Sequence, residues 1–126
     1  MFCHFILYVS DQRISSTFYS RALDQQPTLD VPGMTEFKLG EGCILGLMPS
    51  KGIKKLLGEA IQDPENVKGV PRAEVYLRVS NPELAFMRAL EAGAKLLSPI
   101  EQRNWGARAG YLEDPDGHVI AFSDYN

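Results

Sequence analysis

Two ionisable side chains stand at the starts of similar apolar segments, and together they could move a proton. His4 opens residues 4–9 and Glu74 opens residues 74–79, and both segments are rich in β-branched and aromatic residues. An imidazole beside a carboxylate can act as a general base, because the carboxylate orients the ring and raises its proton affinity. We therefore take His4 and Glu74 as candidate catalytic residues, or as a simple hydrogen-bonded pair in a cleft. Arg78 would balance Glu74 or meet an anionic ligand.

Other common chemistries lack their residues in this sequence. There is no glycine-rich phosphate loop, no nucleophile elbow and no cluster of Cys and His residues. Ser15 and Ser16 fall in a predicted helix, where a nucleophile would have neither a base nor an oxyanion site. His118 is the only other histidine. Strand alternation places it on the side that faces the helix, away from the cleft.

Length and charge limit the class of protein. The 126 residues suit one domain, with 44% hydrophobic and 23% charged residues. A net charge of -3 argues against a nucleic-acid partner, which needs clustered Lys and Arg. No apolar stretch reaches the roughly 20 residues that span a bilayer. Cys3 and Cys43 give no disulfide framework, so we expect a cytoplasmic protein. Both cysteines fall on helix-facing positions, so we expect both thiols to be buried.

The chain contains an internal repeat. Each copy begins with an apolar segment, continues into a helical pattern that contains Arg-Ala-Leu, and ends with a glycine turn and an apolar run. The matching segments are 4–11 with 74–81, 21–23 with 88–90, and 42–47 with 117–122. Two such modules predict a single domain (1–126), with module 1 at about 1–62, a linker at about 63–71 and module 2 at about 72–126.

Local signals define the elements of each module as strand, helix, then further strands. Asp11 is a predicted cap for the first helix, and Asn81 followed by Pro82 is a stronger start signal for the second. Gly93 is placed to end that second helix. A short helix is expected around residues 53–57, before the polar linker.

Alternation along the strands separates a face that packs under a helix from a face that is free for a ligand. In the first strand Phe5, Leu7 and Val9 share the helix side, which leaves His4, Ile6 and Tyr8 opposite. Free faces from both modules would enclose an aromatic and apolar cleft, with Trp105 and Arg108 at its mouth. The predicted ligand-binding residues are Ile6, Tyr8, Ile44, Met48, Tyr76, Arg78, Trp105, Arg108 and Ser123.

On this repeated frame the chain resembles the glyoxalase/bleomycin resistance/extradiol dioxygenase (vicinal oxygen chelate) superfamily. The resemblance covers nearly the whole chain and rests on residues 4–11 leading to Phe18-Tyr19, on Trp-Gly-Ala-Arg at 105–108 and on Asp-Pro-Asp-Gly-His at 114–118. It implies an α+β fold in which two βαβββ modules form a curved, mostly antiparallel sheet around a cavity. It implies no single activity.

The resemblance also implies a divalent metal (Zn, Ni, Mn or Fe), held by His and Glu from equivalent strands. Carried over by position, His4 and Glu74 are the metal ligands, while Gly46 and Ala121 stand at the other two ligand positions. Neither Gly46 nor Ala121 has a donor, so the site is degraded and leaves extra room in the cavity. We therefore expect no tightly bound cofactor.

Three functions remain open. The first is a protein that binds a small organic molecule in the cleft, with or without metal-free catalysis. The second is a metal-dependent lyase or dioxygenase that uses His4 and Glu74. The third is a drug-sequestering resistance protein without catalysis.

The resemblance also implies a homodimer that closes the cavity. A ferredoxin-like sandwich is a competing architecture, but it would bury the polar residues His4, Glu74 and Arg78.

Overall fold

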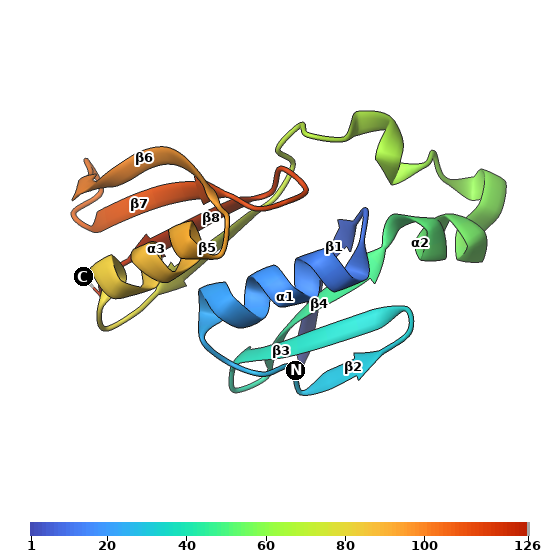
Figure 1. Cartoon of the computed structure of the whole chain (residues 1–126), viewed down its shortest axis with the longest axis horizontal. Helices are drawn as coiled ribbons and strands as arrows, with labels where there is room; N and C mark the ends of the chain where they lie inside the picture. The colour runs from blue at the N-terminus through green and yellow to red at the C-terminus, as the bar shows by residue number, and fades with distance from the viewer. Residues whose placement is uncertain (126) are drawn as a thin grey trace.

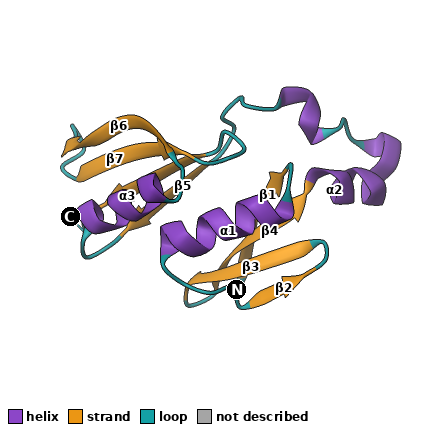
Figure 2. Cartoon of the chain, in the orientation of Figure 1, coloured by secondary structure: helices purple, strands orange, loops and turns teal. Residues whose placement is uncertain are grey.

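The chain folds into two similar units, each with a four-stranded sheet and a helix (Figures 1 and 2). The computed structural model describes residues 1–125. The first unit contains β1 (Cys3–Val9), α1 (Gln12–Leu23), β2 (Leu29–Val31), β3 (Met34–Gly40) and β4 (Cys43–Pro49). The second contains β5 (Glu74–Arg78), α3 (Pro82–Glu91), β6 (Lys95–Gln102), β7 (Arg108–Glu113) and β8 (Val119–Ser123).

Strand order is the same in both sheets, β1-β4-β3-β2 and β5-β8-β7-β6. The first strand pairs in parallel with the last strand of its unit, and the other pairs are antiparallel. β1 and β5 are therefore edge strands. Two βαβββ units of this kind confirm the predicted α+β fold class.

The connection between the units runs out to one end of the molecule (Figure 1). It starts with α2 (Ser50–Leu57), which contains the predicted helix at 53–57, and continues through the short helices η1 (Gly58–Ala60) and η2 (Pro64–Val67). No helix in the described part of the chain is both long and apolar enough to cross a membrane.

Both main helices begin at the predicted caps. Asp11 Oδ1 accepts a hydrogen bond of 2.9 Å from the backbone N of Ile14, and Asn81 Oδ1 accepts one of 3.1 Å from Leu84 N. Pro82 occupies the first turn of α3, where a missing N–H costs nothing. Gly93 has a φ of 107°, which ends α3 as the sequence predicts.

Strand alternation holds along the second half of β1 and fails along its first half. Leu7 and Val9 are buried under α1, as predicted. Phe5, expected on the same buried face, is 45% exposed, and Cys3 is exposed as well. Cys43, opposite Cys3 on β4, is only half-buried. The expectation of buried cysteines is therefore wrong.

The core forms where the helices meet the sheets. α1 packs against α3, and the two helices are neighbours along the long axis of the molecule (Figure 2). Tyr19 of α1 and Asp114 of the β7–β8 turn form a buried contact between the units. The largest fully buried apolar and aromatic side chains are Tyr19, Phe37, Phe122, Leu45, Leu47, Leu112, Ile120 and Val9.

Candidate functional site

We call the side of each sheet that faces away from the helices its open face. On the first sheet this face carries a close polar contact between the predicted residue His4 and Glu36 of β3, with Nδ1 and Oε2 3.3 Å apart. The His4 side chain is about half exposed and that of Glu36 is mostly buried. Ile6 and Tyr8 lie next to this pair on β1, and each is about 40% exposed. The arrangement places an imidazole, oriented by a carboxylate, beside accessible apolar surface.

Glu36 is a site residue that the sequence reasoning missed. Glu36 pairs in register with Gly46 of β4, and Gly46 pairs with Ile6 of β1. His4 and Glu36 therefore lie two strands apart, and no side chain at Gly46 stands between them. The alternation of buried Thr35 and Phe37 around Glu36 was the available signal.

Glu74, the expected partner of His4, lies at the start of β5 in the second sheet and is exposed. Glu74 pairs in register with Val119 of β8. Burial raises the pKa of the Tyr111 phenol, and the Glu74 carboxylate nearby adds to the rise. Within one chain, the structure therefore gives His4 a different carboxylate partner from the expected one.

Gly46 and Ala121 occupy equivalent places in the two sheets. Gly46 lies between Ile6 and Glu36, and Ala121 lies between Tyr76 and Tyr111. Both small residues are buried. A Cβ on Gly46 would come within 3.1 Å of Ile6 Cγ1 and of Met34 Sδ. The extra room that the sequence suggested at Gly46 is thus filled by neighbouring side chains.

Aromatic side chains gather on the open face of the second sheet. Trp105, in the β6–β7 turn, donates from Nε1 to the Tyr76 hydroxyl at 3.2 Å. The Arg103 guanidinium carbon lies 5.2 Å from the centre of the Tyr111 ring, in the geometry of a cation–π contact. Arg103 and Tyr111 are further residues that the sequence analysis did not single out. Flat aromatic surfaces of this kind suit an organic ligand.

Three other predicted ligand residues already have partners in the chain. Arg108 forms a close ion pair with Glu83 of α3, which raises the pKa of the arginine and lowers that of the glutamate. Arg78 donates from Nη2 to the backbone oxygen of Tyr125 at 2.5 Å. Ser123 is buried, with its hydroxyl on Asp124 O. Of the remaining predicted residues, Ile44 and Met48 are half-buried on β4.

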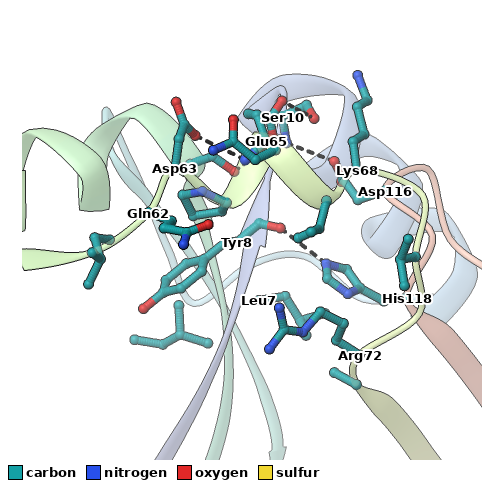
Figure 3. A pocket seen from close by; sticks show the side chains of 18 of the residues that line it. Leu7, Tyr8, Ser10, Gln62, Asp63, Glu65, Lys68, Arg72, Asp116 and His118 are labelled. Carbon is teal, nitrogen blue, oxygen red and sulfur yellow. Dashed lines mark hydrogen bonds between the residues drawn. The ribbon is translucent and has the colours of Figure 1, made fainter.

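A cavity of about 420 Å³ lies along the free edge of β1 (Figure 3). Its other walls are residues 57–73 and the turn that precedes β8. His118 lines this cavity, and its Nε2 lies 3.1 Å from the backbone oxygen of Tyr8. His118 does point away from the open faces, as strand alternation predicts, and it lines this second cavity. The missed signal was the apolar residue Val70 within the polar linker, together with Ile61 just before it.

The residues present do not fit a three-donor metal site within one chain. His4 and Glu36 offer two donors, and Gly46 and Ala121 offer none. Across residues 1–125, no group of three or more His, Cys, Asp or Glu side chains could hold a metal ion.

A family model for the glyoxalase-like domain matches residues 2–125. The chain belongs to this glyoxalase-like family. The predicted superfamily is thereby confirmed, and the match covers both sheets and the connection between them. Relatives of this glyoxalase-like chain include an uncharacterized protein of Mycobacterium bovis, 30% identical over 89% of this chain and 75% of its own length. An uncharacterized protein of Mycobacterium tuberculosis is also 30% identical, over 89% of this chain and 67% of its own length.

Solved structures show the same fold. A glyoxalase-related enzyme from Fulvimarina pelagi has a TM-score of 0.82 at 21% identity, over 98% of this chain and 87% of that one. A glyoxalase/bleomycin resistance protein/dioxygenase from Nocardioides has a TM-score of 0.78 at 23% identity, over 98% and 82%. A protein described by the same three names, from Burkholderia phytofirmans, has a TM-score of 0.81 at 15% identity, over 98% and 97%. At these identities the likeness establishes the fold of the glyoxalase-like chain but not its chemistry, which depends on its own residues.

Proposed function

We propose that this glyoxalase-like protein binds a small organic molecule against the open faces of its sheets. The main support for this proposal is the His4–Glu36 pair, which lies at the surface beside the accessible side chains of Ile6 and Tyr8. Ligand sites combine apolar walls with a few oriented polar groups in this way. The aromatic group of Tyr76, Trp105 and Tyr111 supplies a second such wall.

The proposal includes a homodimer, since each open face is one wall of a site and a second copy would supply the other. β1 is a free edge strand that exposes Phe5, Ile6 and Tyr8, and Phe2 just before it is exposed as well. Exposed apolar edge strands are prone to cover themselves by association. Light scattering should give the mass of two chains, and a single-chain mass at micromolar concentration would exclude this arrangement.

The His4–Glu36 pair also supports a metal-free reaction as a second candidate function. Where the bound molecule carries an acidic C–H or O–H group, the His4 imidazole can accept that proton while Glu36 holds the ring in place. A metal-dependent lyase or dioxygenase is less well supported, because only two donors lie together on this face.

The test is a screen of small aromatic compounds by thermal shift, followed by calorimetric titration of those that bind. His4→Gln and Glu36→Gln should weaken binding of these compounds by about tenfold, the value of one hydrogen bond to a charged group. Glu41→Gln is the matched control, because Glu41 is an exposed carboxylate paired only with Lys38 on the surface. Compounds that bind equally well to the His4 and Glu36 variants would contradict the proposal.

A further inference from the structure

The cavity along the edge of β1 is separate from the open faces, although Ile6 and Tyr8 border both (Figure 3). Its volume of about 420 Å³ lies within the range of small-molecule sites. None of the functions considered above uses residues 57–73, which form most of its wall.

Side-chain hydrogen bonds hold the walls of this cavity in place. Glu65 accepts from the Ser10 hydroxyl at 2.6 Å and from the Ser50 hydroxyl at 2.9 Å, one bond on each carboxylate oxygen. Asp116 accepts from the backbone N of Ser10 at 2.7 Å. The connection between the units and the β7–β8 turn are thereby both tied to the end of β1. A wall fixed in this way is preformed for a ligand.

Uncovered apolar side chains surround the cavity. Phe5, Leu57, Val67 and Val70 all line it, and each is between 43% and 57% exposed. Four large apolar side chains that remain accessible around one concave site are typical of a surface that binds an apolar group. An apolar ligand body would cover these side chains.

Charged side chains of both signs line the cavity, and the two that make no hydrogen bond or ion pair with the described residues, Lys68 and Arg72, favour an anion over a cation. The carboxylates of Glu65, Asp116 and Asp63 already accept hydrogen bonds, the last from the backbone N of Glu65. Arg72 points into the cavity below His118 (Figure 3), and its side chain makes no hydrogen bond or ion pair with the described residues. A guanidinium without a partner at an apolar cavity is suited to a carboxylate, which it can bind through two parallel hydrogen bonds.

We propose that this cavity binds a monoanionic amphiphile, with its carboxylate on Arg72 and its apolar body along Phe5, Leu57, Val67 and Val70. The inference shares Phe5 at the edge of β1 with the proposed homodimer, but it uses neither the His4–Glu36 pair nor the aromatic group of the second sheet, so the two binding sites are tested separately.

Isothermal titration calorimetry of the full chain with decanoate, below its micelle concentration, tests the proposal. Decanoate should bind with a stoichiometry of one per chain. Arg72→Gln should weaken binding by about tenfold or more, the value of a hydrogen bond to a charged group. Leu57→Asp should do the same, because it places a like charge in the apolar wall.

Two matched variants control for general effects. Lys55→Gln removes an exposed positive charge on α2, and Leu56→Asp adds a charge at the exposed neighbour of Leu57, and neither residue lines the cavity. Both should bind decanoate as the parent chain does. Decyltrimethylammonium, which has an alkyl tail of similar length and the opposite charge, should bind much more weakly.

Three results would overturn the proposal. These are no heat of binding with decanoate, equal binding of the ammonium compound, and equal affinities of Arg72→Gln and the parent chain. Equal losses in Lys55→Gln and Arg72→Gln would likewise indicate attraction by overall charge and not a site.

Discussion

The phenol of Tyr19 donates a hydrogen bond of 2.5 Å to Oδ2 of Asp114, and both residues are buried. Tyr19 belongs to α1 in the first unit, whereas Asp114 follows β7 in the second. The other carboxylate oxygen of Asp114 accepts from the backbone N of Asp116 and of His118. One carboxylate therefore shapes the turn before β8 and joins the two units, and the same turn supplies a wall of the β1-edge cavity.

Replacing Tyr19 by Phe should destabilise the chain by about 1.5–3 kcal/mol, because a buried carboxylate would lose a hydrogen-bond donor that nothing replaces. Urea denaturation followed by circular dichroism measures the change. Tyr125→Phe is the control, since Tyr125 is 67% exposed and only its backbone oxygen is bonded. Equal stability of the two variants would show that the Tyr19 contact contributes little.

The same contact should make stability fall at high pH. Burial raises the pKa of Tyr19 well above its usual value, and the Asp114 charge adds to the rise. The unfolded phenol ionises near pH 10, whereas the folded one stays protonated. The resulting stability is fully present below about pH 10 and is lost as the pH rises toward the folded pKa. The parent chain should lose more stability than Tyr19→Phe above this pH, and parallel curves for the two proteins would refute the assignment.

The pKa of Asp114 is also raised, so stability should change with pH in the same direction as for Tyr19, although at lower pH. Its pKa is raised, mainly by burial, although the bond from Tyr19 opposes the rise. Protonated Asp114 therefore stabilises the fold fully below the unfolded pKa, and this contribution is lost as the pH rises through the folded pKa. Removing the Tyr19 hydroxyl should move the pKa of Asp114 further up, which NMR titration of the carboxyl carbon measures. An unchanged or lower value in Tyr19→Phe would contradict this.

The fold was predictable because its signals are local and occur twice. The repeated segments gave two modules, and the caps at Asp11 and Asn81 gave the helix starts. The alternation of Leu7 and Val9 gave the buried face of β1. Each of these depends on residues a few positions apart, where backbone geometry relates sequence to structure directly.

The site was less predictable because its contacts are not local. The distance from His4 to Glu36 depends on the register of two strand pairs and on the missing side chain at Gly46. The exposure of Phe5 depends on the path of a connection that starts about fifty residues later. The alternation of residues along a strand predicts on which face a side chain lies, but it does not predict which element covers that face.

There is no room for a side chain at Gly110, so its replacement by Ala should destabilise the second unit. A Cβ there would lie 2.6 Å from Phe86 Cε2 and 2.7 Å from Ile100 Cγ1, far inside van der Waals contact. Overpacking of this kind costs about 1–3 kcal/mol. Gly40→Ala is the matched control, because nothing lies within 4 Å of its added Cβ. Thermal unfolding should separate the two variants, and similar melting temperatures would contradict the packing of α3 on β7.

The donor set also predicts a low metal content. His4 and Glu36 provide two protein donors, and a tight site for Zn or a similar ion needs three or four. Protein purified without added metal should contain well under one equivalent of transition metal per chain by elemental analysis. Stoichiometric metal that is lost in His4→Ala would contradict this prediction and favour the metal-dependent enzyme instead.

Trp105 should report on the second open face, since it is the one tryptophan of the chain and it is 55% exposed. Its Nε1 bond to the Tyr76 hydroxyl holds the indole against β5. Tyr76→Phe removes that acceptor and should shift Trp105 emission to the red as the ring turns toward water. Stability should change by less than about 0.5 kcal/mol, as for other exposed substitutions. Tyr125→Phe, which leaves the Tyr76 hydroxyl in place, should leave the emission unchanged. Emission that is the same in Tyr76→Phe and in the parent chain would show that the Trp105–Tyr76 contact does not hold the indole in solution.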